Sequence, residues 1–379
     1  MNIIFILIFW LCAFLVLYTY FLYPLILGVL SIFIRRPVRK SDIVPYVSLI
    51  IAAYNEEKSI ANKIENSLNL DYPKSKLQII VASDCSDDST DKIVLSFKDR
   101  GVILVRQNKR LGKTSTQNQA VQFAKGEVIL FTDATTRLRS DVIRKIVRNF
   151  ADESVGCVGA MLKYSDDKKS KLGRARRIYW EYEKFLRRRE SNLNSLLGVS
   201  GCCYAVRKKV YKAMDPQLIS DFVISWFVVE QGYRSVFESE AQVYEDIVET
   251  ERDEVNMRTR VVGRSIVAIK LMKRFLNPLR FGFFSFQLFS HKILRYCVPI
   301  FIILIFISNL FLVNIEPYRF FLITQIAFIG LGLVSLIFRE KSIFYPLAYF
   351  IIGNLSILKG FLKSTSGRKK FDIWQPLRR

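Results

Sequence analysis

Long uncharged runs lie near both ends of the chain. The first run, residues 1–34, contains no charged residue and exceeds the roughly 20 residues with which a helix crosses a bilayer. Three further uncharged runs approach that length, at residues 296–315, 320–338 and 342–358. We therefore predict an integral membrane protein with an N-terminal transmembrane helix within residues 1–36 and C-terminal transmembrane helices within residues 296–360.

Basic residues orient the first predicted helix. Arg35, Arg36, Arg39 and Lys40 follow it directly, and the positive-inside rule places such a cluster in the cytoplasm. The run lacks a basic start and a small-residue cleavage site, so we do not expect a removable signal peptide. The N-terminus is then expected outside, with the rest of the chain anchored in a bacterial cytoplasmic membrane and the domain at residues 45–250 facing the cytoplasm.

The last run leaves the number of crossings open. Three full crossings after residue 296 would carry the basic tail, residues 361–379, to the outside, against the positive-inside rule. The third of these runs contains Pro346, Gly353 and Asn354, which are compatible with an interfacial or re-entrant segment. The sequence therefore predicts three or four crossings in total.

Residues 45–250 alternate apolar, β-rich segments with polar and amphipathic ones. We predict strands at residues 47–53, 77–82, 102–105 and 128–131, each followed by a polar loop. This alternation is typical of an α/β, Rossmann-like sheet with parallel strands. Because ligands bind beyond the carboxyl ends of such strands, four side chains are expected to converge there: Glu56, Asp84, Lys113 and Asp133.

The two earlier carboxylates of this set also have simpler explanations. Asp84 can cap the helix that follows it, and Glu56 can be a solvated carboxylate that the dipole of the next helix favours. The sequence alone leaves both alternatives open.

The basic loop after the third strand resembles known phosphate-binding motifs only in part. Gly112, Lys113 and Thr114 resemble the end of a P-loop, but Gln107 stands where that motif requires its first glycine. No G-x-G-x-x-G sequence follows a strand either. The loop therefore carries neither of these two nucleotide-binding motifs. Its basic residues could bind a diphosphate or could simply be solvated.

Composition narrows the possible partners. The formal net charge is +23 and 51% of the residues are apolar, but many basic residues lie beside the membrane segments. Residues 251–295 combine apolar positions at helical spacing with basic ones such as Arg258, Arg260 and Arg264. We therefore expect amphipathic interfacial helices there, in contact with membrane lipids, and no nucleic-acid partner.

Composition also narrows the chemistry. The six cysteines show no C-x-x-C spacing, and the single histidine, His291, excludes zinc sites built on several histidines. With no other histidine, a Ser-His-Asp triad is also not expected. The catalytic groups should therefore be mostly carboxylates.

Six short motifs follow one another along the chain. They are AAYNEE (52–57), SDCSDDST (83–90), NKRLGKTSTQN (108–118), FTDATT (131–136), VSGCCYAVRK (199–208) and SDFVISWFVVEQGYR (220–234). In this order they resemble the motifs of membrane-bound family 2 glycosyltransferases, a family related to the cellulose, hyaluronan and chitin synthases. The resemblance covers nearly the whole chain and extends to residues 178–191, 290–296 and the closing WQPLRR.

The resemblance implies a glycosyltransferase A-type fold flanked by transmembrane and interfacial helices. It also implies that a sugar is transferred with inversion from a nucleotide sugar, most often a UDP-sugar. By this resemblance the donor would be bound by Ala53, Tyr54, Glu56, Asp84 and Lys113, with Glu56 and Asp84 at the uridine.

Asp133 resembles the first aspartate of the family's D-x-D metal motif and would also contact the donor. Thr135 occupies the place of the second aspartate. A divalent cation, Mn²⁺ or Mg²⁺, is therefore expected to bridge the diphosphate, with more of its ligands supplied by substrate and water.

Asp221 stands where the family's catalytic base lies, with Ser220 in place of the usual glutamate. Its carboxylate would accept the proton of the acceptor hydroxyl as that oxygen attacks the sugar carbon. The alternative is that Asp221 caps a helix over residues 222–229.

The acceptor side is expected to include Gly201, Cys202 and Trp180. The glycine would let the backbone approach a sugar closely, and Trp180 could stack on a sugar or pack in the core. The family's Q-x-x-R-W motif falls on residues 257–261, where only Arg260 is retained. Arg260 could pair with the diphosphate or contact lipid.

These expectations favour transfer of one or a few sugars from a nucleotide sugar to a lipid-linked or saccharide acceptor, in cell-surface polysaccharide biosynthesis. Two alternatives stay open. One is a processive polysaccharide synthase, which the loss of the motif's tryptophan disfavours. The other is a non-catalytic membrane scaffold that keeps the fold.

Overall fold

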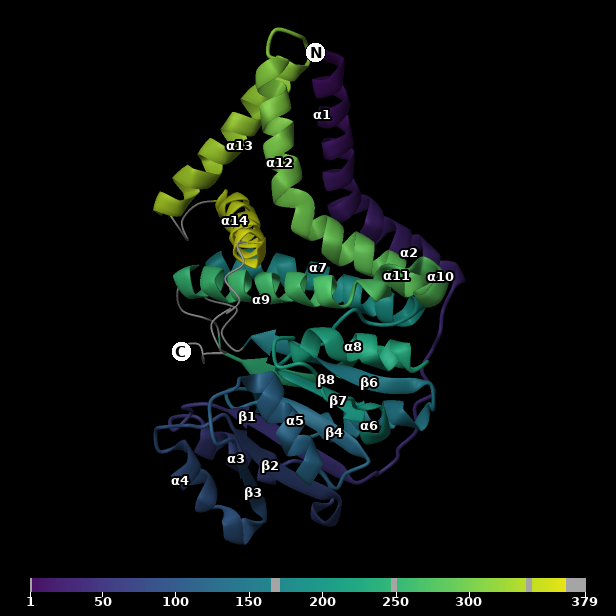
Figure 1. The fold of residues 1–379 in the computed structure, drawn as a ribbon, viewed down its shortest axis with the longest axis vertical. Helices are drawn as coiled ribbons and strands as arrows, with labels where there is room; N and C mark the ends of the chain where they lie inside the picture. Colours follow the sequence, from purple (N-terminus) through teal and green to yellow (C-terminus); the bar gives the residue numbers. More distant parts are fainter. Residues whose placement is uncertain (1, 165–170, 247–250, 339–342, 366–379) are drawn as a thin grey trace.

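The computed structural model describes residues 2–164, 171–246, 251–338 and 343–365. Most of the predicted basic tail lies outside these residues. Along the long axis of the molecule, Figure 1 shows an α/β domain, then a layer of helices lying across that axis, then a group of helices running along it. The layer of crossing helices therefore connects the α/β domain to the apolar helices.

The α/β domain is built on one eight-stranded sheet with strand order β3-β2-β1-β4-β7-β6-β8-β5. The strands are β1 (Val47–Ala53), β2 (Leu77–Ser83), β3 (Val102–Arg106), β4 (Val128–Asp133), β5 (Arg137–Leu138), β6 (Val155–Tyr164), β7 (Cys203–Arg207) and β8 (Arg234–Glu245). Strands β1 to β4 run parallel, so their carboxyl ends meet at one edge. The predicted α/β, Rossmann-like fold is confirmed.

The second half of the sheet reverses direction. β7 pairs antiparallel with both β4 and β6, and Thr132 at the end of β4 lies opposite Cys203 at the start of β7. β8 pairs parallel with β6 through two irregularities of register. This reversal brings the loop before β7 to the edge where the parallel strands end.

Helices cover both faces of the sheet, and for this reason every residue of β1 is buried. One face carries α3 (Ile60–Leu68), α4 (Thr90–Leu95) and α6 (Val142–Val147), and the other carries α5 (Lys113–Phe123) and α8 (Ser220–Glu230). The core beside α8 continues into the crossing layer, because the fully buried Trp226 of α8 packs against Phe275 and Phe284. The sheet domain and the crossing layer thus share one apolar core.

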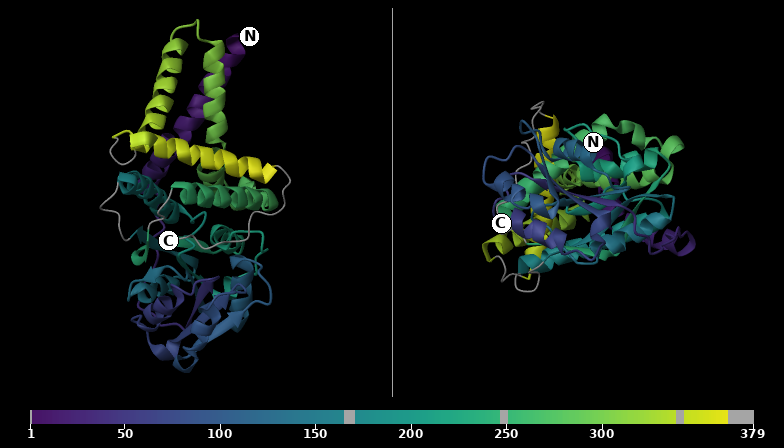
Figure 2. Two further views of the ribbon diagram at one scale, coloured as in Figure 1. Left: turned by 90° about the vertical axis from the view of Figure 1, so that its left-hand side faces the viewer. Right: turned by 90° about the horizontal axis from the view of Figure 1, so that it is seen from below.

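The crossing layer contains α7 (Lys171–Leu193), α9 (Glu251–Leu271), α10 (Pro278–Phe281) and α11 (Phe283–Gln287). Above it lies α14 (Tyr345–Thr365), which Figure 2 shows running across the axis of the apolar helices. α14 packs closely on α9: a Cβ at Gly360 would lie 2.9 Å from the carbonyl oxygen of Thr259. The predicted amphipathic helix at this place is therefore sandwiched between α14 and the α/β domain.

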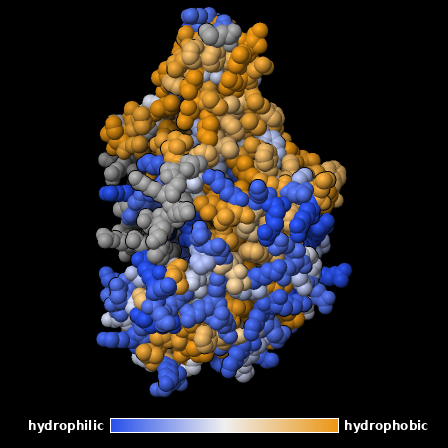
Figure 3. All heavy atoms as spheres, viewed as in Figure 1, coloured by the Kyte–Doolittle hydropathy of each residue, from blue (hydrophilic) through white to orange (hydrophobic). Residues whose placement is uncertain are grey.

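The remaining helices run along the long axis. α1 (Asn2–Leu17) continues into α2 (Tyr23–Phe33) through a π-helical turn. In the same way, α11 of the crossing layer continues into α12 (Leu294–Phe311), and α13 (Tyr318–Phe338) follows. Four helical segments, including one within α14, are long and apolar enough to cross a membrane by length and composition. Figure 3 shows apolar side chains gathered over the end of the molecule formed by α1, α12 and α13, and polar side chains over the α/β domain.

Candidate active site

The loop after β2 and the loop after β3 are tied together by Asp84. The Asp84 carboxylate, which is buried, accepts hydrogen bonds from the backbone N–H groups of Leu111 (2.8 Å) and Gly112 (2.9 Å). Burial raises the pKa of this carboxyl, while these two hydrogen bonds oppose the rise. Asp84 is therefore a partner of the basic loop and does not cap α4, whose N-cap is Ser89.

Gly112 has a conformation that few other residues adopt. Its φ of 92° lies in the left-handed region, where a Cβ is strained, and its ψ is 163°. The turn directs its N–H to Asp84 and starts α5 at Lys113. The predicted donor lysine is thus placed by a glycine at the first position of a helix.

The loop after β1 closes the same edge. The carbonyl of Ala53 accepts the N–H of Asp84 (2.9 Å), and the guanidinium of Arg110 lies 3.8 Å from the ring centre of Tyr54. Glu56 is 8% exposed and accepts a hydrogen bond from the hydroxyl of Ser59, so it is not a solvated surface carboxylate. The structure therefore brings Ala53, Tyr54, Glu56 and Asp84 to one edge of the sheet.

Lys113, Asp133 and Asp221 form the charged centre of this edge. The Lys113 ammonium makes an ion pair with the Asp133 carboxylate and donates a hydrogen bond to the carbonyl of Gly201 (3.2 Å). Burial lowers the pKa of Lys113, but the negative charges of Asp133 and Asp221 outweigh it, and the pKa lies above its ordinary value. Lys113 is thus held as a cation between two carboxylates.

Asp221 lies in the first turn of α8, one residue after the start of the helix. The N-cap residue is Ile219, and no side chain caps this helix end, so the capping alternative does not describe Asp221. Burial raises the pKa of its carboxyl, Lys113 lowers it and Asp133 raises it, with a net rise. A carboxylate with a raised pKa is a stronger base near neutral pH than an exposed aspartate.

Gly201 lies between the charged groups of Asp221 and Lys113 and a cavity that is described below. A Cβ at this position would collide with the carboxylate of Asp221 and lie 3.3 Å from the Lys113 ammonium. Next to it, the hydroxyl of Thr132 donates to the carbonyl of Cys202 (2.8 Å), which fastens this loop to the end of β4. The glycine is therefore required by close approach rather than by an unusual backbone conformation.

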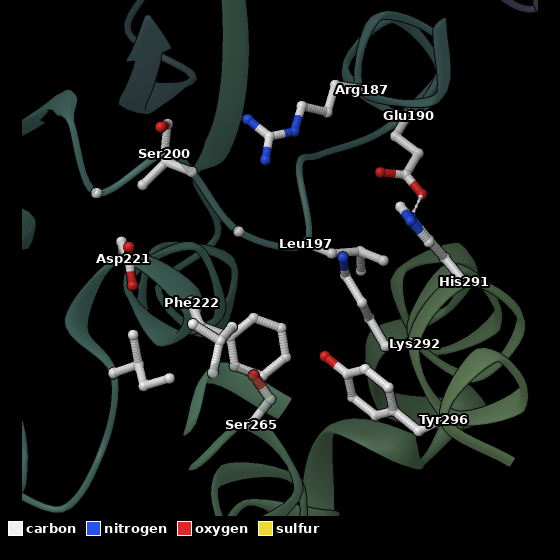
Figure 4. Close-up of a pocket in the computed structure, with 15 residues that line it drawn as sticks. Arg187, Glu190, Leu197, Ser200, Asp221, Phe222, Ser265, His291, Lys292 and Tyr296 are labelled. Atoms are coloured by element: carbon white, nitrogen blue, oxygen red, sulfur yellow. Dashed lines mark hydrogen bonds and ion pairs between the residues drawn. The ribbon is translucent and has the colours of Figure 1, made fainter. Parts of the chain in front are cut away.

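A cavity of about 240 Å³ opens on the far side of Asp221 (Figure 4). Its walls come from the loop at residues 197–201, from α7, α8 and α9, and from the helix that leads into α12. Asp221 lines it on the side of the α/β domain, and Lys292 and Tyr296 line it on the side of the apolar helices. The cavity thus joins the candidate base to the membrane-facing part of the molecule.

The structure does not bring every predicted residue to this cavity. Trp180 on α7 lies beside Tyr164 and Tyr179 and does not line it. Cys202 packs against the sheet core, where burial raises the pKa of its thiol well above the ordinary value. Arg260 lies on α9 and likewise does not line the cavity. Their roles in binding donor or acceptor stay predictions.

Two cations near the site were not predicted from the sequence to belong to it. Lys63 is buried on α3, and its ammonium donates to the hydroxyl of Thr132 (2.9 Å) and to the carbonyl of Thr136, on either side of Asp133. Burial lowers the pKa of Lys63 to about 8. The sequence signal that could have identified Lys63 as buried is its position between Ile60 and Ile64, on the apolar face of an amphipathic helix.

Arg264 is the second of these cations. Its guanidinium donates to the carbonyl oxygens of Pro216 (3.1 Å) and Leu218 (3.0 Å), in the loop that leads into α8. Arg258, also on α9, pairs with Glu254 (2.8 Å) and contacts Tyr349 of α14. In the structure these two arginines bind protein groups.

The sheet edge offers few protein ligands to a divalent cation. No group of three or more His, Cys, Asp or Glu side chains suited to a metal occurs in the described ranges. The Asp133 side chain is 21% exposed at the strand edge, next to the basic loop. One such carboxylate fits a hard cation that takes its other oxygen ligands from a diphosphate and water, as Mg²⁺ commonly does.

Comparisons with known proteins agree with this architecture. Residues 48–214 match the family model "Glycosyl transferase family 2". The probable glycosyltransferase YdaM of Bacillus subtilis is 28% identical over 276 residues, which are 65% of this chain and 63% of that protein. The poly-β-1,6-N-acetyl-D-glucosamine synthase of Staphylococcus aureus is 26% identical over 225 residues, 57% of this chain and 53% of that protein. The chain thus spans less than two thirds of either relative.

A solved structure is similar over nearly the whole chain. It is the mannosyltransferase PcManGT from Pyrobaculum calidifontis in complex with GDP-Man and Mn²⁺, with a TM-score of 0.73 and 19% identity. The match covers 95% of this chain and 99% of that one, and at this identity it shows the fold alone. Residues 48–214 therefore form a domain of glycosyl transferase family 2, carried on a glycosyltransferase A-type sheet and flanked by apolar helices.

Proposed function

We propose that this protein is a membrane-bound inverting glycosyltransferase. It would transfer a sugar from a nucleotide sugar, in the first instance a UDP-sugar, to a lipid-linked or saccharide acceptor. The observation that carries the proposal is the meeting of Lys113, Asp133 and Asp221 at the sheet edge, with a cavity beyond Asp221 that reaches the apolar helices. The family 2 domain at residues 48–214 and the two relatives named as a glycosyltransferase and a polysaccharide synthase support it.

The donor would lie along the carboxyl ends of β1, β2 and β4. Glu56, Asp84 and Tyr54 lie where the nucleoside would bind, and Lys113 and Asp133 lie where the diphosphate would bind. Donor binding would exchange the ion pair between Lys113 and Asp133 for contacts to the diphosphate. A divalent cation held by Asp133 would neutralise charge on the departing nucleoside diphosphate.

Asp221 would then act as the general base. The acceptor oxygen bonds to the anomeric carbon as the bond from that carbon to the diphosphate breaks, and the acceptor proton passes to the Asp221 carboxylate. A single displacement of this kind inverts the anomeric configuration and needs no second, covalent carboxylate. The negative charge of Asp133 and the burial of Asp221 both raise the pKa of the base, which suits it to this task.

The test is nucleotide release by the detergent-purified protein with a panel of UDP-sugars and GDP-sugars, with and without Mn²⁺ or Mg²⁺. We expect release with one donor, and a loss of about 10²- to 10⁴-fold in Asp221→Asn while nucleotide binding is retained. Asp99→Asn, at an exposed turn of the α/β domain, is the matched control and should keep full activity. Full turnover by Asp221→Asn would exclude the assigned base.

Two other functions give different results in the same assay. A processive synthase, as the similarity to the poly-N-acetylglucosamine synthase would suggest, makes a ladder of long chains, whereas the proposed enzyme adds one or a few sugars. A non-catalytic scaffold releases no nucleotide with any donor or acceptor extract. Turnover that depends on both Asp133 and Asp221 excludes the scaffold.

A further inference from the structure

Two basic side chains enter the cavity beyond Asp221 from the side of the membrane. Arg187 comes from α7 and Lys292 from the π-helical turn before α12, and Figure 4 shows both pointing into the space that Asp221 lines from the opposite side. Both side chains are only partly exposed. Neither residue belongs to the motifs from which the donor site was predicted.

Neither cation has a polar partner in the described part of the chain. Arg187 has only a ring contact, its guanidinium lying 5.8 Å from the centre of Trp180, and Lys292 forms no hydrogen bond or ion pair there. The nearest carboxylates have other partners. Glu190 accepts from the hydroxyl of Tyr23 (2.8 Å) and contacts Nδ1 of His291 (2.6 Å), and Glu183 pairs with Arg295.

Such a pair of cations points to an anionic ligand. Removing a charged group from water costs free energy when no partner replaces the water, and repulsion between two like charges beside one cavity adds to this cost. A bound phosphate ester would remove it, because a guanidinium offers a planar pair of donors that match phosphate oxygens and an ammonium supplies a second point charge. A neutral hydroxylated ligand would leave both cations without a counter-charge.

The rest of the cavity indicates that the ligand is a lipid. Its other walls include the apolar side chains of Leu197, Ile219, Phe222 and Val261. Lys292 and Tyr296 belong to the segment Phe283–Phe311, which is long and apolar enough to enter a membrane. A phosphate between Arg187 and Lys292 would therefore lie where a lipid headgroup reaches the protein from the bilayer.

We propose that this cavity binds the phosphate of a lipid-borne acceptor between Arg187 and Lys292, and so presents the acceptor hydroxyl to Asp221. This assignment rests on the proposed function, since it gives the base a substrate on the membrane side. The phosphate can belong to a polyprenyl carrier or to the headgroup of a phospholipid. In either case the acceptor is selected by its charge as well as by its apolar chain.

The test compares matched lipids that differ only in the phosphate or phosphate headgroup. Dissociation constants of the full-length protein in dodecyl maltoside are measured for farnesyl phosphate against farnesol, and for phosphatidylglycerol against diacylglycerol. We expect the phosphate lipid of at least one pair to bind about ten- to a hundredfold more tightly, as for charge-assisted hydrogen bonds. The pair that shows this advantage identifies the source of the phosphate.

The variant Arg187→Gln/Lys292→Gln should reduce the advantage to about twofold or less, the level left by general attraction to a basic protein. Arg188→Gln removes an exposed charge at the next position of α7 and should keep the advantage. Equal binding of both members of each pair by the wild-type protein would overturn the proposal, and so would an unchanged advantage in the double variant.

Two further measurements keep the outcome interpretable. Nucleotide binding by the double variant shows that this variant is folded. If the double variant does not bind nucleotide, the test uses Arg187→Lys and the wild-type comparison instead. Lipid affinities are measured without a donor. A failure of sugar transfer would therefore contradict the proposed function and leave the lipid result valid. Equal lipid affinities together with active transfer would contradict the phosphate site and leave the proposed function valid.

Discussion

Gly201 lies against the carboxylate of Asp221 and the ammonium of Lys113, so a single methyl group there would reach the proposed base. In Gly201→Ala the new Cβ would collide with the Asp221 carboxylate. We expect the variant to displace the base and to lose about 10²-fold in transfer rate, the usual cost of misplacing a catalytic group by about 1 Å.

The control for this substitution is Gly330→Ala, because a Cβ at Gly330 meets nothing within 4 Å. Its transfer rate should match the wild type. Both rates are measured by nucleotide release at saturating donor. A normal rate in Gly201→Ala would mean that the loop yields, and that Asp221 is not held by contact with it.

At the residue scale, the sequence predicted the residues that meet at the sheet edge better than those that line the cavity. Asp84 directly follows β2, Asp133 is the last residue of β4, and Lys113 comes at the end of the loop after β3, so strand patterns alone bring them to one edge. Arg187 and Lys292 come from helices that are more than 90 positions apart in the sequence and meet only through packing. Trp180, chosen by its residue type, packs beside other aromatic rings.

At the scale of elements, α9 holds the loop that leads into α8. Arg264 donates to the carbonyls of Pro216 and Leu218, and the hydroxyl of Thr114 on α5 also donates to Leu218 (2.8 Å). Three helices therefore meet at the loop that positions Asp221. The positive charge of Arg264 also opposes the burial that raises the pKa of Asp221.

Arg264→Gln should change both the geometry and the titration of the base. Asp221 must be ionised to accept a proton, so the rate rises with pH through its pKa. Without Arg264 this pKa rises further, and the acid limb of the pH–rate profile should move to higher pH. The plateau rate should fall about two- to tenfold as the loop loosens.

The matched variant is Arg274→Gln, which removes an arginine that pairs with Glu230 (3.0 Å) at the other end of α8. Its acid limb should coincide with that of the wild type. An unmoved limb in Arg264→Gln would show that Arg264 does not act on the charge of Asp221. A limb moved equally in both variants would point to a general effect of net charge.

A helix or strand was predicted well where neighbouring residues alone specify it. The parallel strands β1 to β4 are short apolar runs with polar loops, and they were found in the sequence within two residues. The antiparallel strand β7 and the irregular pair β6 and β8 depend on pairing between distant segments, which no local pattern specifies. The direction of α14 likewise depends on its packing against α9, not on its composition.

At the scale of the whole molecule, the direction of α14 bears on the membrane topology. α13 has 21 residues, about 31 Å of helix, and can span a bilayer. α14 is as long, but it lies across α12 and α13 in Figure 2, and its mean hydropathy of 1.3 is well below the 2.2 to 2.5 of the other three candidate segments. We therefore propose three crossings, with α14 at the surface on the side of the α/β domain.

This topology removes the conflict over charge that the sequence raised. With α1, α12 and α13 as the crossings, we expect the N-terminus outside, and the α/β domain and the end of the chain, whose sequence is basic, in the cytoplasm, as the positive-inside rule requires. A reporter that fluoresces only in the cytoplasm should be active after residue 379 and within the exposed turn at residues 99–101. A reporter active only outside should work in the turn at residues 313–316. If the C-terminal reporter were active only outside, α14 would be a fourth crossing, and the basic tail would then violate the charge rule.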